Sequence, residues 1–187
     1  MDKAEIREIY KTKRMHLSPK ELEERSIAVV QHFFTKFDVI DKTVSLFLPI
    51  EKQKEINTYL LLEKAMDFGA KIVLSRSNFE SGTMRHFLYE ESDGLELNSL
   101  GIPEPKKGKP ISPDKIDLVI VPLLAIDEKG HRVGYGRGFY DRFLAKCNPN
   151  CQFVGLSLFD EFVEISNLDR TDVPLNSFVS PAGIHRF

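Results

Sequence analysis

Residues 134–141 read Gly-Tyr-Gly-Arg-Gly-Phe-Tyr-Asp and carry the strongest chemical signal in the chain. Glycine tolerates a positive φ and lets the backbone approach a ligand closely, and successive bare N–H groups in such a turn form a concave anion site. Arg137 adds a fixed positive charge, and Asp141 supplies oxygens of the kind that Mg²⁺ accepts. A loop of this kind that runs into a helix is suited to a polyphosphate and its metal.

Neither of the two common nucleotide motifs matches this loop. A P-loop requires Gly-Lys-Ser/Thr after the glycines, and the dinucleotide motif is Gly-x-Gly-x-x-Gly directly after a strand. The spacing here is Gly-x-Gly-x-Gly, and a predicted hairpin precedes it. On spacing alone the loop is either an anion site or a tight turn that only reverses the chain. The neighbouring Arg137 and Asp141 favour the anion site.

Other charged residues could act with this loop, but each also has a structural explanation. Lys3, Arg7 and Lys11 are four residues apart, so they share one face of a predicted helix. This stripe is either a phosphate clamp or a solvated charged face. Glu55 precedes a helix, where a carboxylate is electrostatically favourable, and Asp172 lies near a proline, where an aspartate is typical of a turn.

The histidines and cysteines do not predict a metal centre. None of the five histidines is paired at the spacing of metal ligands. Cys147 and Cys151 are the only cysteines, and no second Cys/His pair completes a zinc site beside them. Two cysteines do not make a disulfide framework, and they indicate a reducing compartment.

Composition indicates one soluble, folded domain. The chain has 187 residues, of which 42% are hydrophobic, so a sizeable core is expected and disorder is not. The formal charge of −2 disfavours general nucleic-acid binding. The N-terminus lacks the apolar core of a secretory signal, and no run reaches the length of a membrane span. We therefore expect a cytoplasmic protein.

Strands alternate with helices along the chain, which predicts an α/β sandwich with a mostly parallel sheet. Ser18 and Glu21 predict a capping box at the start of the second helix. Residues 98–113 are expected to form a long surface loop near the site. The expected helices are residues 2–16 (anchored by Ile6, Ile9 and Tyr10), 19–37, one ending near 68, and 138–145. The expected strands are residues 43–48, 71–74, 84–89, 117–121 and 153–158, with a hairpin across 125–133.

Taken together, several blocks of the sequence resemble the signature of the 5-formyltetrahydrofolate cyclo-ligases, also called 5,10-methenyltetrahydrofolate synthetases. The blocks follow the order of the family and span nearly the whole chain. They are Lys3 and Arg7 with Arg14 and 17–18 (Leu-Ser), 55–58 (Glu-Ile-Asn-Thr), 101–105 (Gly-Ile-Pro-Glu-Pro), 119–122 (Val-Ile-Val-Pro), 134–144, and 172–175 (Asp-Val-Pro-Leu). The chain departs from the pattern at Leu123-Leu124, at Thr171 in place of a histidine, and at Arg137, where glycine or lysine is common.

The resemblance implies one domain over residues 1–187, folded as a three-layer α/β/α sandwich with a mostly parallel, Rossmann-like sheet. It implies a ligase that cyclises 5-formyltetrahydrofolate to 5,10-methenyltetrahydrofolate. ATP phosphorylates the formyl oxygen, and ADP and phosphate are released. Mg²⁺ is the implied cofactor, with no permanently bound organic group. Two alternatives remain: a non-catalytic folate-binding or regulatory protein of this fold, and a related ATP-dependent enzyme that acts on another formylated amine.

The resemblance also assigns site residues. The expected catalytic residues are Arg137, Lys3 and Tyr140, and the expected metal ligands are Asp141 and Asp172. The expected ATP-binding residues are Lys3, Arg7, Gly134, Tyr135, Gly136, Arg137, Gly138, Phe139, Tyr140, Asp141 and Arg142. The expected folate-binding residues are Ile50, Glu55, Arg137, Gly138 and Tyr140. The expected partners are ATP and 5-formyltetrahydrofolate, with or without a polyglutamate tail, and neither nucleic acid nor a membrane. We expect a monomer, with a dimer as the alternative.

Overall fold

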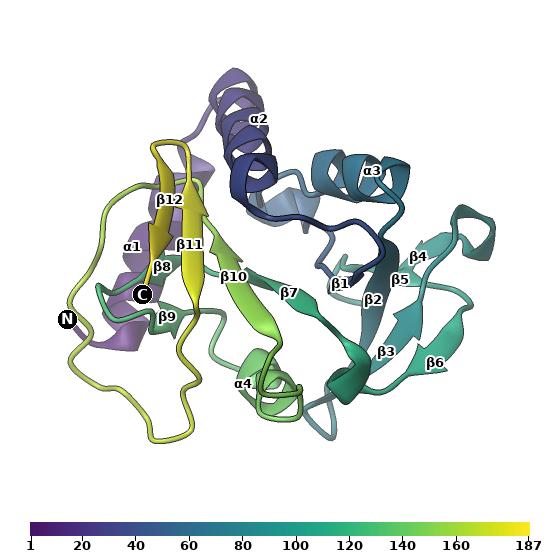
Figure 1. Cartoon of the computed structure of the whole chain (residues 1–187). Coiled ribbons are helices and arrows are strands. Elements are labelled where there is room, and N and C mark those ends of the chain that lie inside the picture. The colour runs from purple at the N-terminus through teal and green to yellow at the C-terminus, as the bar shows by residue number, and fades with distance from the viewer.

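An eight-stranded sheet runs through the centre of the protein, whose computed structural model describes residues 1–187 (Figure 1). Its spatial order is β12-β11-β10-β7-β1-β2-β3-β6. The five strands from β11 to β2 are parallel, whereas β12, β3 and β6 are antiparallel to their neighbours. The strands are β1 (Thr43–Ser45), β2 (Lys71–Asn78), β3 (Thr83–Leu88), β6 (Lys109–Ile111), β7 (Leu118–Pro122), β10 (Gln152–Leu156), β11 (Ser177–Ser180) and β12 (Gly183–Arg186).

Four helices and two small antiparallel ribbons complete the fold. The helices are α1 (Lys3–Met15), α2 (Pro19–Lys36), α3 (Tyr59–Asp67) and α4 (Phe139–Leu144). One ribbon pairs β4 (Leu95–Leu97) with β5 (Pro103–Pro105), and the other pairs β8 (Ala125–Ile126) with β9 (Arg132–Val133). Short 3-10 helices cover Glu51–Gln53, Glu91–Asp93 and Pro113–Lys115.

Alternate residues of β7 enter different cores, which shows that both faces of the sheet are covered. Ile120 joins the cluster formed with α2 and α3, which contains Phe33 and Leu61. Val119 and Val121 join the cluster on the other face, with residues of α4. Figure 1 shows α2 and α3 above the sheet and α4 below it. The predicted three-layer α/β/α sandwich with a mostly parallel sheet is confirmed.

The two N-terminal helices begin at capping residues. The Ser18 hydroxyl accepts a hydrogen bond from the Glu21 N–H at 3.2 Å, and the Glu21 carboxylate accepts one from the Ser18 N–H at 2.8 Å. Pro19 takes the first helical position, where its missing N–H costs nothing. Asp2 and Glu5 form the same reciprocal pair at the start of α1. The predicted capping box is confirmed.

Helix α1 packs against the β8–β9 ribbon, and this contact places its basic residues beside the glycine loop. Ile6 and Tyr10 are buried in a cluster with Leu124 and Val133. Ile9, the third expected anchor, is 41% exposed, so that part of the prediction is wrong. With 3.6 residues per turn, position 9 lies about 100° around the helix from Tyr10, which places Ile9 at the edge of the buried face.

Two parts of the sheet were not expected from the sequence. Residues 98–113 were predicted as a loop, but they contain β5 and β6, and β6 extends the main sheet at its edge. Both strands carry prolines, which sequence reasoning reads as turn residues but which edge strands tolerate. The β11–β12 hairpin was also missed, because β11 (Ser-Phe-Val-Ser) and β12 (Gly-Ile-His-Arg) contain few apolar residues. Conversely, regular pairing of β1 ends at Ser45, earlier than the expected residue 48.

The chain runs outward in opposite directions from β1 and β7, which are neighbours in the sheet. Towards one edge it continues into β2, and towards the other into β10 and β11. In open α/β sheets, ligands bind beyond the carboxyl ends of the strands at such a switch point. The residues that follow β1 and the last residue of β7, Pro122, border a large cavity at this edge of the sheet.

Candidate active site

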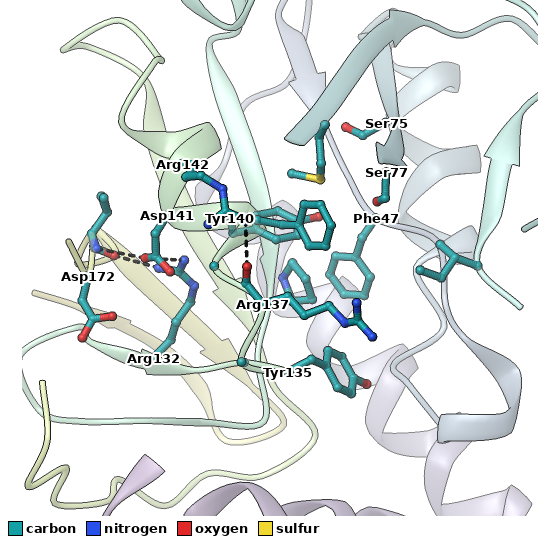
Figure 2. Close-up of a pocket in the computed structure, with 18 of the residues that line it drawn as sticks. Phe47, Ser75, Ser77, Arg132, Tyr135, Arg137, Tyr140, Asp141, Arg142 and Asp172 are labelled. Carbon is teal, nitrogen blue, oxygen red and sulfur yellow. Dashed lines mark hydrogen bonds and ion pairs between the residues drawn. The ribbon is translucent and has the colours of Figure 1, made fainter. Parts of the chain in front are cut away.

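One cavity of about 1310 Å³ contains every site residue assigned from the sequence. Its walls come from the start of α1, the ends of the central strands, the glycine loop and residues 167–174 (Figure 2). The fourteen assigned residues that line it are Lys3, Arg7, Ile50, Glu55, the nine residues 134–142, and Asp172. The fold therefore brings together residues from both ends of the chain. The individual roles stay predictions.

The glycine loop has the backbone geometry expected of an anion site. Gly136 and Gly138 have φ values of +85° and +66°, which side-chain-bearing residues rarely adopt. A Cβ atom on Gly136 would lie 3.0 Å from Nη2 of Arg7. The N–H groups of residues 134–138 donate to no protein acceptor. These residues are exposed or partly exposed, so the row of donors at the cavity wall is open to water and is suited to an external acceptor.

Two arginines hold the loop at either end. Nε of Arg7 donates to the Gly134 carbonyl at 2.8 Å. Nη2 of Arg142 donates to the Arg137 carbonyl at 2.7 Å, and its Nε donates to the Gly82 carbonyl at 2.7 Å. Arg142 thereby ties the loop to the turn between β2 and β3. Both residues were assigned to ATP, and here part of each guanidinium is engaged by backbone carbonyls.

Arg137 is the cation of the loop with the fewest restraints. Its guanidinium makes no ion pair and lies 5.1 Å from the centre of the Phe79 ring. Figure 2 shows it directed into the cavity near Phe47. Phe79 also packs edge-on against Phe139, with ring centres 5.5 Å apart. An exposed, unpaired guanidinium beside free N–H groups makes this wall of the site electropositive.

Asp141 is held by a buried arginine that sequence reasoning missed. Nη2 of Arg132 donates to Oδ1 of Asp141 at 2.8 Å, and the Val173 N–H donates to the same oxygen at 3.1 Å. Nη1 of Arg132 donates to the Val173 carbonyl at 2.8 Å. These contacts place Asp172, the neighbour of Val173, on the same side of the cavity as Asp141 (Figure 2). The only sequence signal was a charged residue inside a short, otherwise apolar hairpin strand.

The second aspartate forms an ion pair with the N-terminal helix. Oδ2 of Asp172 accepts hydrogen bonds from the Lys3 ammonium and from the Asp169 N–H, the latter at 2.7 Å. Lys3 was assigned to ATP and to catalysis. In the structure its side chain points to a carboxylate at the cavity wall, with only 18% of the side chain exposed.

The two aspartates offer Mg²⁺ only part of a coordination sphere. No group of three or more His, Cys, Asp or Glu side chains could hold a metal ion. Asp141 uses one oxygen for Arg132 and Val173, and Asp172 uses one for Lys3, which leaves the other oxygen of each carboxylate without a protein partner. Mg²⁺ is usually bound by one or two carboxylates together with phosphates and water. The residues fit a metal that arrives with a phosphate ligand.

Glu55 lies in the opposite wall and is almost closed off from solvent. Its residue exposure is 6%, and its Oε2 accepts from the Ile50 N–H at 2.7 Å. Its Oε1 accepts from the Tyr135 hydroxyl, whose oxygen in turn accepts from Nη2 of Arg14. Burial raises the pKa of the Glu55 carboxyl, although the hydrogen bonds and the nearby Arg14 act in the opposite direction. Tyr135 was assigned to ATP binding, yet its hydroxyl donates a hydrogen bond to Glu55, which was assigned to folate binding.

Tyr140 lines the cavity between these two walls. Burial raises the pKa of its phenol, with a further contribution from the negative charge of Glu55. Its ring packs against Phe143 at 6.0 Å between centres. Tyr140 is therefore neutral at physiological pH and can act as a hydrogen-bond donor, but not as a base.

Comparison with known proteins identifies the family. The chain matches the 5-formyltetrahydrofolate cyclo-ligase family over residues 1–181. The chain belongs to this family. The 5-formyltetrahydrofolate cyclo-ligase of Escherichia coli K12 is 30% identical over 177 residues, which cover 92% of this chain and 96% of that protein. A probable 5-formyltetrahydrofolate cyclo-ligase of Schizosaccharomyces pombe is 28% identical over 159 residues, 78% of each chain.

Solved structures agree with this assignment. The 5,10-methenyltetrahydrofolate synthetase of Aquifex aeolicus superimposes with a TM-score of 0.81 and 27% identity, over 100% of this chain and 93% of that chain. The synthetase of Mycoplasma pneumoniae, at 21% identity and a TM-score of 0.75, covers 97% of this chain and 99% of that chain and supports the fold. The predicted membership of a ligase family is confirmed. No helix combines the length and apolarity that a membrane crossing requires.

The buried position of Glu55 predicts a pH dependence of stability. Because the pKa of Glu55 is higher in the folded than in the unfolded protein, its ionisation destabilises the fold as pH rises through the folded-state pKa. Glu55→Gln removes this loss. The melting temperature of the variant relative to wild type should therefore become more favourable between about pH 4 and about pH 7.

Thermal melts across this pH range provide the measurement. Glu63→Gln, on the exposed side of α3, is the matched surface control. A difference between Glu55→Gln and wild type that stays constant with pH would contradict the prediction.

Proposed function

We propose that this protein catalyses the ATP-dependent cyclisation of 5-formyltetrahydrofolate to 5,10-methenyltetrahydrofolate. Family membership supports the folate substrate and the ligase class. The observation that carries the proposal is the single cavity, in which an electropositive glycine loop faces a buried carboxylate. Cavities for one drug-sized ligand usually measure about 300–1,000 Å³, and this one is about 1310 Å³. The volume suits two substrates side by side.

The glycine loop is the proposed ATP side. The free N–H groups of residues 134–138 point at no protein acceptor and are available to phosphate oxygens. Arg137, which has no ion-pair partner, is placed to neutralise charge on the transferring phosphoryl group. Lys3 and Arg7 close this wall from α1. Phosphoryl transfer depends mainly on such positioning and charge stabilisation, and it needs no covalent nucleophile from the protein.

Glu55 is the proposed folate side. A pterin ring carries adjacent N–H donors on one edge, and a buried carboxylate can accept from both. Such buried pairing discriminates strongly, because a ligand without the donors leaves the carboxylate unpaired. Ile50 holds Glu55 in place through its backbone N–H, and Tyr140 lies between the two walls. The aromatic side chains of Phe47 and Tyr140 supply apolar surface for the ring.

The proposed reaction has two steps. The formyl oxygen attacks the γ-phosphorus of ATP, the bond to the bridging oxygen breaks, and ADP leaves with that electron pair. N10 of the folate then attacks the activated formyl carbon and loses its proton. The carbon–oxygen bond breaks, inorganic phosphate departs with the oxygen, and the 5,10-methenyl cation remains. Arg137 and the loop N–H groups would stabilise the negative charge that develops in both steps.

Asp141 and Asp172 are the residues that would hold Mg²⁺ with the ATP phosphates. The metal would neutralise phosphate charge and orient the γ-phosphoryl group. Lys3 pairs with Oδ2 of Asp172, which leaves Oδ1 of that carboxylate for the metal. Arg132 keeps Asp141 in position from behind.

An absorbance assay tests the proposed function. Purified protein with Mg²⁺, ATP and 5-formyltetrahydrofolate should produce the near-ultraviolet band of 5,10-methenyltetrahydrofolate, with one ADP formed per turnover. The omission of either ATP or folate should abolish the band. If neither the band nor ADP forms, the enzymatic function is wrong, and binding of folate without turnover would favour the non-catalytic alternative.

Arg137→Ala should lower kcat by about 100-fold or more and change the affinity for folate little, because the guanidinium acts on charge that develops in the transition state. Arg137→Lys keeps the charge but lacks the planar donor pair, so its kcat should lie between those of the wild type and Arg137→Ala. Steady-state kinetics with both substrates varied provide the measurement. Wild-type kcat in Arg137→Ala would exclude this residue from the mechanism.

Asp141→Asn should raise the Mg²⁺ concentration that gives half-maximal activity. The amide oxygen can still accept from Arg132 and Val173, so the fold should persist while the metal loses a charged ligand. A Mg²⁺ titration of activity checks this, with Asp67→Asn at the exposed end of α3 as the control. An unchanged titration curve would assign Asp141 a purely structural role.

A further inference from the structure

The Tyr135 hydroxyl lies between two buried, charged side chains from distant parts of the chain. It donates to Oε1 of Glu55, and its oxygen accepts from Nη2 of Arg14. Arg14 is 5% exposed and Glu55 is 6% exposed. Nε of Arg14 has no hydrogen-bond partner. The proposed reaction assigns no role to the phenol of Tyr135, so this contact needs its own explanation.

With Tyr135 in this position, both oxygens of Glu55 are engaged. The Ile50 N–H donates a hydrogen bond to Oε2, and the Tyr135 hydroxyl donates one to Oε1. The Ile50 contact comes from the backbone five residues away and belongs to the local fold. The Tyr135 contact joins residues eighty positions apart. A ligand that donates to Oε1 of Glu55 from the cavity therefore competes with the hydroxyl of Tyr135.

The backbone around Tyr135 has the conformational freedom to change its position. Glycines lie on both sides, and Gly136 has a φ of +85°, so the backbone can pivot without a steric penalty. The Tyr135 N–H has no acceptor, and 36% of the residue is exposed. Arg7 and Arg142 hold the carbonyls of residues 134 and 137, and the backbone of the two residues between them makes no hydrogen bond to the protein.

Hydrogen bonds to ionised partners are stronger than those between neutral groups. The Tyr135 hydroxyl makes two of them, one to Glu55 and one to Arg14. These contacts favour the closed position when the cavity holds no ligand. Arg14 stays behind Glu55 when Tyr135 leaves, so the carboxylate is not left as an isolated buried charge. The N–H groups that would bind ATP phosphates belong to the same loop, so phosphate binding pulls on the segment that carries Tyr135.

We propose that Tyr135 is a positioning residue that covers Glu55 in the ligand-free protein and withdraws when nucleotide orders the glycine loop. This inference rests on the proposed function and adds to it a coupling between the two substrate sites. ATP binding would uncover the folate acceptor, and folate binding would release the loop for ATP. Because such coupling is reciprocal, each substrate should increase the affinity for the other by the same factor.

The test uses Tyr135→Phe, which keeps the ring and removes the hydroxyl. The dissociation constant for 5-formyltetrahydrofolate is measured by calorimetry, alone and with a nonhydrolysable ATP analogue plus Mg²⁺. In wild type the nucleotide should tighten folate binding by about tenfold, the scale expected from the loss of one hydrogen bond to a charged group. In Tyr135→Phe, folate alone should bind with the affinity that wild type reaches only with nucleotide, and the nucleotide should add less than about twofold.

Two controls separate this role from a structural one. Tyr59→Phe removes a phenol that forms no hydrogen bond and does not line the cavity, so its coupling should equal that of wild type. Tyr135→Ala removes the ring as well and should also abolish the coupling, provided that its melting curve remains cooperative. A merely structural role for Tyr135 would lower the melting temperature and leave the ratio of the two dissociation constants unchanged.

The outcomes also distinguish the proposed function from the coupling. If wild type turns over substrate but Tyr135→Phe retains the wild-type nucleotide effect, or binds folate more weakly than wild type, the role of Tyr135 is overturned alone. If wild type shows neither turnover nor folate binding, the proposed function fails and the coupling fails with it.

Discussion

The buried ion pair between Arg132 and Asp141 is the contact on which the site geometry depends. It joins the last strand of the β8–β9 ribbon to the start of α4, and the second guanidinium nitrogen continues the link to Val173. The side chain of Arg132 is only 6% exposed. An unpaired charge at such a position is strongly destabilising, so the three segments are held in one arrangement. The glycine loop lies between two of them, and Asp172 lies in the third.

The glycine loop itself combines firm anchoring with unsatisfied donors. Arg7 and Arg142 hold its carbonyls, while the N–H groups face the cavity without partners. Residues 135–137 are exposed, so water can solvate these donors until an acceptor such as a phosphate oxygen replaces it. The arginines of the loop therefore have two different roles. Arg7 and Arg142 donate to backbone carbonyls and fix the shape of the loop, whereas Arg137 is left without a polar partner.

Local signals in the sequence were reliable wherever the cause of structure is local. Ser18, Pro19 and Glu21 started α2 as expected, and the apolar run of β7 became a central strand covered on both faces. The edge strands that contain prolines were missed because their pairing depends on β3 and β4, which a reading of residues 98–113 alone does not include. The early end of β1 has the same kind of cause, since pairing there depends on β2 and β7.

The sequence by itself determined the chemical inventory of the site and the conformational freedom of the glycine loop, because the missing Cβ of glycine acts within a single residue. The family resemblance rested on these residue types in their order, and all fourteen assigned residues line the cavity. Only the tertiary structure decided which polar side chains meet: Lys3 with Asp172, Arg132 with Asp141, and Tyr135 with Glu55. Ion pairs and hydrogen bonds act over a few ångströms, and the strand order of the sheet selects which distant segments come that close.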